Sequence, residues 1–225
     1  MAINLKSTKG LHALGVKMVV YGNSGAGKTS LIPTLPRPLV LSAEGGLLSI
    51  ADSDTPFIEI GSVEDLMEAY QWLTESAEAK GFDSIALDSI SEIAEVVLNA
   101  EKKSTKDGRA AYGNLAEKMT DVIRAFRDVP EKHVLFTAKC DKTPDETGRI
   151  LYSPSMPGKT LTQQLPYFFD LVLALRVEKD AEGIVQRALM TDSDGIWQAK
   201  DRSGKLSAWE SPDLGAIIRK IGGEV

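Results

Sequence analysis

The chain has 225 residues, 43% of them hydrophobic, and a formal net charge of −6. This length and apolar content suit one large domain, and the acidic balance excludes a protein coated in positive charge. The single cysteine, Cys140, cannot form an internal disulfide, and no apolar run approaches the roughly 20 residues that span a bilayer. A cytoplasmic protein without a membrane partner is therefore expected.

Apolar runs and helical periodicities alternate along the first part of the chain. Short apolar runs predict strands at residues 16–21, 38–43, 57–62, 83–88 and 133–138. Helices are expected from a capping box at 62–65 to about residue 81, at 91–103 and at 115–129. The polar stretches 104–114 and 141–160 are expected to be loops. This alternation predicts an α/β fold with a mostly parallel sheet covered by helices on both faces.

The pattern changes near the C-terminus. Strand-like runs at 168–177, 184–191 and 195–201 are separated by the turn signals Asp180-Ala-Glu-Gly183 and Asp192-Ser-Asp-Gly195, which predict an antiparallel extension. A last helix is expected at Ser211-Pro212-Asp213, with proline at its first position. We therefore expect one domain over 1–225, divided into an arm (1–14), a core (15–140), a loop (141–160) and a C-terminal section (161–225).

A glycine-rich motif follows the first predicted strand. Gly22-Asn-Ser-Gly-Ala-Gly-Lys28-Thr29 fits the pattern G-x-x-x-x-G-K-[ST], with a strand before it and a helix expected after it. Such a loop binds phosphate oxygens through backbone N–H groups, with the lysine on the β- and γ-phosphates and the threonine hydroxyl on Mg²⁺. ATP and Mg²⁺ are the expected cofactors. The expected nucleotide-binding residues are Gly22, Asn23, Ser24, Gly25, Ala26, Gly27, Lys28, Thr29 and Ser30.

Two carboxylates end predicted strands. Asp88 closes the run Ile-Ala-Leu-Asp and fits a Walker B metal ligand beside Thr29, although it can also cap the helix that follows. Glu44 ends the strand after the P-loop, at the sheet edge where ligands of open α/β sheets bind. There it can orient or deprotonate the water that attacks the γ-phosphate, with Gly45 and Gly46 turning the chain away. The alternative is an exposed glutamate at a strand end.

The order of these motifs resembles the RecA family of ATPases. "LSAEGG" and "IALDSIS" stand where that family has its catalytic glutamate and its Walker B aspartate followed by serine. "QAKDR" resembles the segment in which two basic residues reach the ATP of a neighbouring subunit. The resemblance thus implies that Lys28 and Glu44, with Lys200 and Arg202 in trans, are catalytic. Over residues 13 to 206 the chain is most similar to phage-type single-strand annealing ATPases, a minimal RecA core.

This resemblance implies partners as well. It implies a homo-oligomer, filament or ring, with ATP at subunit interfaces, single-stranded DNA as ligand, and possibly a single-stranded DNA-binding protein. Basic residues would follow DNA phosphates and tyrosines would stack on bases. The implied DNA-binding residues are Lys102, Lys103, Lys106, Arg109 and Tyr112 in the first loop, and Lys142, Arg149, Tyr152 and Lys159 in the second.

The expected function is a Mg²⁺-dependent, DNA-stimulated ATPase that promotes annealing or strand pairing in phage-type recombination. Two alternatives stay open. A P-loop nucleotide kinase would share the phosphate loop and would transfer phosphate to a nucleoside monophosphate. A DNA-binding protein that uses ATP only as a conformational switch would keep its DNA activity in a Glu44→Gln variant.

Overall fold

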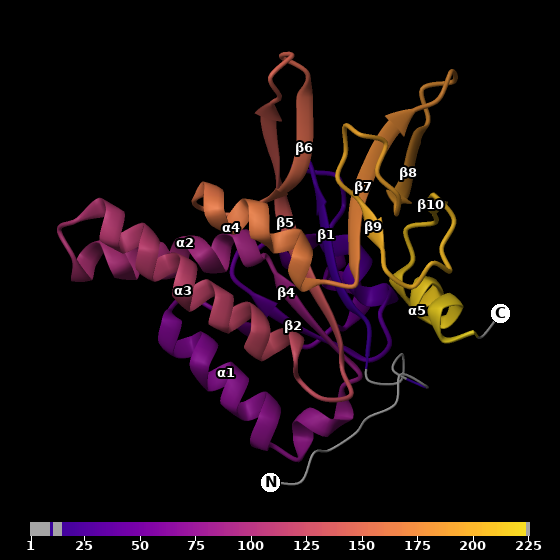
Figure 1. Cartoon of the computed structure of the whole chain (residues 1–225). Helices are drawn as coiled ribbons and strands as arrows, with labels where there is room; N and C mark the ends of the chain where they lie inside the picture. Colours follow the sequence, from indigo (N-terminus) through magenta and orange to yellow (C-terminus); the bar gives the residue numbers. More distant parts are fainter. Residues whose placement is uncertain (1–9, 11–14, 224–225) are drawn as a thin grey trace, which may run out of the picture.

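The computed structural model describes residue 10 and residues 15–223, which form a central sheet flanked by helices (Figure 1). The sheet order is β10-β8-β7-β1-β5-β4-β2-β3, with β6 paired to β5 and β9 paired to β7. The strands are β1 (Lys17–Gly22), β2 (Pro38–Ser42), β3 (Phe57–Glu59), β4 (Ser84–Asp88), β5 (His133–Pro144), β6 (Ile150–Ser155), β7 (Leu171–Lys179), β8 (Val185–Met190), β9 (Lys200–Asp201) and β10 (Trp209–Glu210).

The strand directions confirm the predicted α/β class. Strand β1 runs parallel to β5 and β7, and the series continues in parallel through β4, β2 and β3. Strands β6, β8, β9 and β10 are antiparallel to their neighbours. Four consecutive residues of β1, Met18 to Tyr21, have no exposed surface, as expected of a strand covered on both faces.

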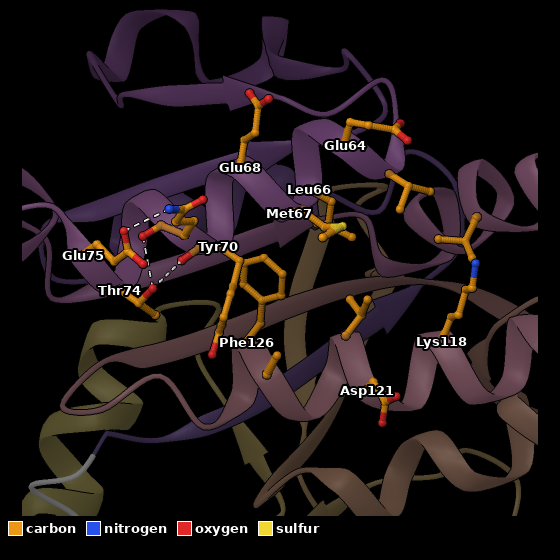
Figure 2. A pocket seen from close by; sticks show the side chains of 15 residues that line it. Glu64, Leu66, Met67, Glu68, Tyr70, Thr74, Glu75, Lys118, Asp121 and Phe126 are labelled. Atoms are coloured by element: carbon orange, nitrogen blue, oxygen red, sulfur yellow. Dashed lines mark hydrogen bonds between the residues drawn. The ribbon is translucent and has the colours of Figure 1, made fainter.

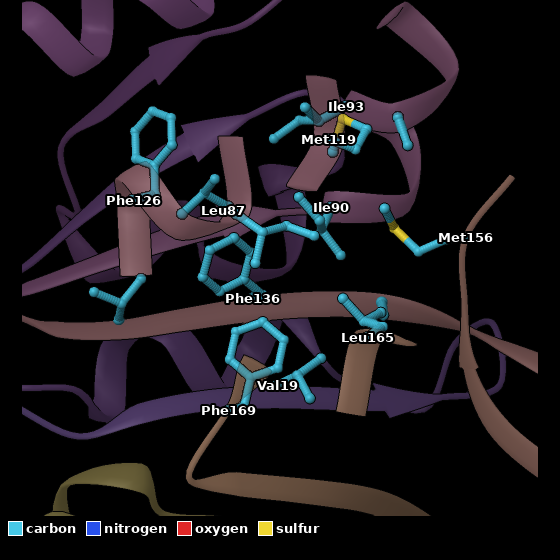
Figure 3. Packing of buried hydrophobic residues seen from close by; sticks show 14 of the residues in the cluster. Val19, Leu87, Ile90, Ile93, Met119, Phe126, Phe136, Met156, Leu165 and Phe169 are labelled. Carbon is cyan, nitrogen blue, oxygen red and sulfur yellow. The ribbon is translucent and has the colours of Figure 1, made fainter. Parts of the chain in front are cut away.

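Helices cover both faces of the sheet. They are α1 (Val63–Glu75), α2 (Ile90–Ser104), α3 (Gly108–Arg127), α4 (Lys159–Gln164) and α5 (Leu214–Gly222), with short 3₁₀ helices at Thr29–Thr34 (η2), Leu47–Ser53, Glu78–Gly81 and Leu165–Phe168. Helices α1 to α4 pack on one face, and α5 packs on the other together with η2. Figure 3 shows the first core, where Phe136 of β5 lies against Phe169 with ring centroids 4.9 Å apart. Truncating Phe136 to alanine would cost about 3–5 kcal/mol of unfolding free energy.

The stretch 104–114, predicted to be a loop, is mostly helical. Only Thr105 to Asp107 separate α2 from α3, because the Asp107 carboxylate accepts a hydrogen bond from the backbone of Arg109 and caps α3 at its start. Ala111 and Leu115, four residues apart, are fully buried and anchor this first part of the helix. The glycines at 108 and 113 suggested a loop, but tertiary packing overrides their low helix propensity.

The stretch 141–160 is also not a loop. It holds the end of β5, the whole of β6 and the start of α4, and β5 and β6 form a hairpin that extends beyond the sheet (Figure 1). The turn is closed by Asp145, whose carboxylate accepts backbone hydrogen bonds from Thr147 and Arg149, while Gly148 has a positive φ of 82°. The polar composition of this segment therefore belongs to a solvent-exposed ribbon.

Three element boundaries differ from the sequence predictions. The segment after the P-loop is the short 3₁₀ helix η2 with Pro33 inside it, because proline removes a helix hydrogen bond and prevents a longer α-helix. Helix α1 ends at Glu75, since Ser76 is extended. Helix α5 is capped by Asp213, so Pro212 precedes the cap and is not its first residue.

The strand predicted at 195–201 is reduced to the two residues of β9. The Asp194 carboxylate accepts hydrogen bonds from the backbone N–H groups of Ile196 and Trp197, which holds this segment in an irregular path. The predicted hairpin at Asp180–Gly183 is confirmed between β7 and β8. The predicted arm, 1–14, lies outside the described residues except for Gly10. Within the described part of the chain, no helix is long and apolar enough to cross a membrane.

Candidate nucleotide site

The P-loop leaves the carboxyl end of β1 and turns tightly into η2. Gly25 and Gly27 have positive φ angles of 74° and 102°, a backbone conformation that other L-residues rarely adopt. Ala26 between them is buried, so the loop is packed onto the sheet. This is the geometry in which successive backbone N–H groups can converge on an anion.

The ammonium of Lys28 lies across the P-loop. It donates hydrogen bonds to the carbonyls of Gly22 and Asn23 at 3.1 and 3.2 Å. Partial burial lowers the pKa of Lys28, and the nearby carboxylates of Glu44 and Asp88 oppose this by favouring the charged form. A desolvated cation of this kind is stabilised by a bound phosphate.

Asp88, at the carboxyl end of β4, is the most buried carboxylate of this edge. It is only 2% exposed, and its Oδ2 accepts a hydrogen bond from the Thr29 hydroxyl at 2.8 Å. The Thr137 hydroxyl of β5 donates to its other oxygen. Burial raises the pKa of Asp88, and the two hydroxyl donors offset this in part. The side chain thus bonds to Thr29, as a metal-ligand pair requires, and the helix α2 that follows is capped by Ser89 instead.

The donor set at this point fits Mg²⁺. The ion prefers a few protein oxygens together with water and substrate phosphate, and Thr29 and Asp88 supply a hydroxyl and a carboxylate. Ser42 adds an independent observation. It pairs with Asp88 in register across β2 and β4, so both side chains point to the same face of the sheet.

The Ser42 hydroxyl is the unsatisfied group of the site. Among the side chains that the structure describes, it is the buried one whose oxygen has no hydrogen-bond partner. Buried polar atoms of this kind call for a missing water or ion. No cluster of three or more His, Cys, Asp or Glu side chains suited to a metal occurs among the described residues.

Glu44 lies where the sequence predicted it, at the same edge. The Ser89 hydroxyl donates a hydrogen bond to Glu44 Oε1, which ties the end of β2 to the residue after Asp88. Gly45, directly after it, has a φ of 65°, so the turn requires a glycine there. The carboxylate is exposed and is held in place, which makes it accessible to water beside the phosphate loop.

Lys139 completes this edge from β5. Its ammonium forms a 2.6 Å ion pair with Glu92 of α2, and this pairing raises the pKa of Lys139. Glu44 adds a smaller contribution in the same direction, so the two groups are close. The carboxyl ends of β1, β2, β4 and β5 therefore bring together two cations, two carboxylates and four hydroxyl groups.

The comparisons with known proteins agree with this geometry. Residues 14–203 match the family model described as AAA domain (AAA_24). The chain belongs to this AAA domain family of P-loop ATPases. A RecA-like P-loop fold and a nucleotide as cofactor follow from this membership and from the strand order.

One solved structure that matches this chain is the KaiC-like protein PH0186 from the hyperthermophilic archaeon Pyrococcus horikoshii OT3. It is 12% identical, with 78% of this chain and 77% of that chain covered and a TM-score of 0.45. No curated protein matches this AAA domain in sequence.

Lys200 and Arg202 lie at the opposite end of the AAA domain's sheet from its own P-loop. Lys200 pairs with Val172 near the start of β7, and Arg202 bonds to Asp170, whereas the P-loop adjoins Leu175 further along β7. The Lys200 ammonium donates to the carbonyl of Pro166 at 2.7 Å. The two residues therefore do not join the phosphate site of their own chain.

The first group of predicted DNA-binding residues lies on helices. Lys102 and Lys103 are in the last turn of α2, Lys106 is in the short connection, and Arg109 and Tyr112 are in the first turns of α3. All five are exposed. The Lys102 ammonium lies 5.7 Å from the centre of the Tyr112 ring. Tyr112 also lines a cavity of about 330 Å³ with Gly158 and Lys159, so the two predicted DNA segments meet here.

The second group lies on the β5–β6 hairpin and α4. Arg149 pairs with Asp145 at 3.3 Å, and Lys159 is exposed at the start of α4. Tyr152 is already stacked, since its ring lies parallel to that of Trp197 with centroids 4.1 Å apart, and Lys142 covers it at 5.8 Å. Trp197 therefore occupies one face of the Tyr152 ring, so the predicted stacking of a DNA base would compete with contacts within the chain.

Sequence reasoning missed three residues. Tyr167 is 78% exposed and lines a groove of about 850 Å³ with Lys159, and nothing in its local sequence marked it. In the sequence, Ser42 is only part of a predicted strand end. Arg187 is not among the predicted site residues, yet its side chain contacts the P-loop. Side chains alternate between the two faces of β8, and Leu189, two residues after Arg187, is buried. This alternation is the sequence signal that places Arg187 on the same face as the P-loop.

A second hollow lies away from the P-loop. It has a volume of about 770 Å³ between α1 and α3, and Figure 2 shows Tyr70 and Phe126 inside it. Its lining includes Glu64, Glu68, Glu75 and Asp121 against a single lysine, Lys118. This acidic lining disfavours a phosphate ligand.

Proposed function

We propose that this AAA domain is a Mg²⁺-dependent ATPase that binds single-stranded DNA and promotes annealing or strand pairing. The observation that supports hydrolysis best is the Ser89–Glu44 hydrogen bond beside Lys28 and Asp88. It holds a carboxylate at the phosphate edge without burying it. A nucleotide-binding loop with no catalytic task has no need of that arrangement.

The P-loop and Lys28 bind the phosphates in this proposal. Backbone N–H groups of the loop would donate to phosphate oxygens, and the Lys28 ammonium would exchange its carbonyl partners for β- and γ-phosphate oxygens. Thr29 and Asp88 would hold Mg²⁺, which supplies positive charge to the β- and γ-phosphates when bound.

Glu44 acts on the attacking water. Its Oε1 accepts the hydrogen bond of Ser89, which leaves Oε2 to accept a proton of a water molecule placed in line with the γ-phosphate. The proton moves to this carboxylate as the oxygen of the water attacks phosphorus, and ADP leaves. Ser89 keeps the carboxylate oriented throughout.

The proposed DNA path follows the groove between the β5–β6 hairpin and α4. Lys159 supplies positive charge and Tyr167 an exposed aromatic ring. The amides of Gln163, Gln164 and Gln198 and the carboxylate of Asp141 also line the groove. A lysine and an exposed aromatic ring beside neutral amides are suited to a flexible single strand, and Asp141 offsets part of the lysine's charge. Tyr112 and Lys102 extend the path onto α3 and α2.

A head-to-tail homo-oligomer, filament or ring, is part of the proposal. Lys200 and Arg202 lie beside the start of β7, too far from the P-loop to reach a nucleotide bound to their own chain. A role in hydrolysis therefore requires a neighbouring subunit. Arg202 is held by an exposed ion pair worth at most about 1 kcal/mol, which a neighbour's phosphate can replace. A single-stranded DNA-binding protein would be a further partner on the same DNA.

Annealing of two complementary, dye-labelled oligonucleotides tests the DNA activity. We expect pairing to be faster with the protein and ATP than with the protein and ADP, and slow without protein. Equal rates with ATP, ADP and no nucleotide would contradict a role for the nucleotide. Transfer of labelled phosphate from ATP to a nucleoside monophosphate, with no effect on annealing, would favour a nucleotide kinase instead.

A further inference from the structure

Arg187 of β8 contacts the P-loop of its own chain. Its Nε donates a hydrogen bond to the carbonyl of Ala26 at 3.0 Å, although 161 residues separate the two in sequence. The same nitrogen lies 3.4 Å from the position that a Cβ on Gly27 would occupy, so arginine and loop are in close contact. Within the described residues, this is the one hydrogen bond that the Arg187 guanidinium donates.

The strand geometry explains this contact. Leu189, two residues further on, is fully buried in the core that contains η2, so Arg187 points to the same face of the sheet. The neighbouring strand β7 also touches the loop, since a Cβ on Gly22 would lie 2.9 Å from the carbonyl oxygen of Leu175. The β7–β8 hairpin thus borders the P-loop at two points.

The hydrogen-bonded carbonyl has a defined effect on the loop. In a trans peptide unit the C=O and the following N–H point in opposite directions. An arginine that holds the Ala26 carbonyl on the outer side of the loop therefore turns the N–H of Gly27 to the inner side. That N–H is one of the donors that a phosphate-binding loop needs.

We propose that Arg187 is a positioning residue that clamps the P-loop in its phosphate-binding form. It acts through the Ala26 carbonyl and not on the reacting phosphate. The inference rests on the nucleotide binding proposed above and adds that the antiparallel hairpin sets nucleotide affinity. If the loop is in its binding form for only a fraction of the time, the apparent dissociation constant rises by the inverse of that fraction.

Nucleotide affinity of single variants tests the clamp. Arg187→Met keeps the aliphatic stem that packs on Gly27 and removes the donor, whereas Arg187→Lys keeps one donor. Lys179→Ala is the matched control, because Lys179 is an exposed cation on the same face of the same hairpin. The probes are fluorescent ADP and ATP with Mg²⁺, followed by steady-state turnover and by hydrogen exchange of the amides of residues 22–28.

We expect Arg187→Met to weaken binding of both ADP and ATP about tenfold, to change kcat less than twofold and to speed amide exchange in the loop. Arg187→Lys should restore most of the affinity, and Lys179→Ala should behave as the unaltered protein. Unchanged affinity, an equal loss in Arg187→Met and Lys179→Ala, or a loss confined to kcat would overturn the inference. If the unaltered protein binds neither nucleotide, the clamp and the proposed ATPase both fail. If it binds both and Arg187→Met binds them with the same affinity, only the clamp fails.

Discussion

The hydroxyl of Ser89 donates a hydrogen bond to the carboxylate of Glu44, and this bond joins the carboxyl ends of β4 and β2. The same hydroxyl accepts a hydrogen bond from the backbone N–H of Glu92 and caps helix α2. One small side chain therefore connects the candidate catalytic carboxylate to a rigid helix start. Glu44 depends on this connection, because it is exposed and lies two residues beyond the end of β2.

Replacing Ser89 separates the orientation of Glu44 from the binding of the nucleotide. Ser89→Ala should lower kcat for ATP about tenfold, since Glu44 loses its orienting donor, and leave the affinity for ADP within about twofold. It should also lower the free energy of unfolding by about 1 kcal/mol through loss of the helix cap. Ser89→Thr keeps the hydroxyl and should recover both properties. A Ser89→Ala protein with normal kcat would show that Glu44 needs no positioning.

Neutralising Asp88 should stabilise the protein in the absence of Mg²⁺ but abolish its Mg²⁺-dependent activity. Burial raises the pKa of Asp88 above 3.8, so the native state binds the proton more tightly than the unfolded state does. The free energy of unfolding therefore falls as pH rises from about the ordinary carboxyl pKa through the raised pKa. At pH 7 the buried charge of Asp88 destabilises the native state. Asp88→Asn should raise Tm at pH 7 without Mg²⁺, show no difference near pH 3, and abolish Mg²⁺-dependent turnover.

Asp83, just before the other end of β4, is the matched control. The hydrogen bond from Arg37 lowers the pKa of Asp83, so its stabilisation is present above the ordinary carboxyl pKa and is lost as pH falls through the lowered one. Asp83→Asn should thus lower Tm at pH 7 or leave it unchanged, and should keep turnover. If Asp88→Asn also lowered Tm without metal, the buried carboxylate would be a stabilising group and the proposed site would lose its support.

The sequence predicted the central sheet well, because its buried strands are short apolar runs bounded by turn residues. The P-loop, Glu44 and Asp88 could be placed because each follows such a run directly. The two supposed loops could not be predicted. The turn residues Asp145 to Gly148 form the same kind of hairpin signal as Asp180 to Gly183. The segments on either side of Asp145 to Gly148 lack a clear alternation of apolar and polar residues, so the sequence does not predict this hairpin.

Features that depend on tertiary contacts stayed hidden in the sequence. The unpaired hydroxyl of Ser42 appears only when β2 lies beside β4. The stacking of Tyr152 on Trp197 joins residues from two separate segments, and it occupies one face of a ring that the family resemblance implied for DNA. No local pattern reports a partner that is distant along the chain.

Replacing Lys159 tests whether the proposed groove binds DNA. Lys159→Ala should weaken binding of an oligo-dT strand about threefold at moderate salt and reduce the slope of log K against log salt by about 0.7, as expected for the loss of one phosphate contact on a single strand. Lys80→Ala is the control, since Lys80 is an exposed lysine in the 3₁₀ helix before the amino end of β4. Equal losses in the two variants would mean that only overall charge matters.

Mixing of inactive variants tests the oligomer. If Arg202 completes a neighbour's site, Lys28→Ala and Arg202→Ala should each be inactive alone. An equal mixture should regain about one quarter of full ATP turnover, because half of the P-loops are intact and half of those face an intact Arg202. A mixture as inactive as its components, or a protein that stays monomeric with ATP and DNA, would remove Lys200 and Arg202 from the mechanism.

The most direct test is ATP turnover with and without single-stranded DNA, measured for the unaltered protein, Glu44→Gln and Glu59→Gln. Glu59 is an exposed carboxylate at the end of the neighbouring strand β3, so its variant controls for loss of charge at this edge. We expect turnover to rise with DNA, to fall about 100-fold or more in Glu44→Gln and to stay normal in Glu59→Gln. A turnover rate that changes neither with DNA nor with the Glu44 substitution would contradict a DNA-coupled ATPase in which Glu44 acts on the attacking water.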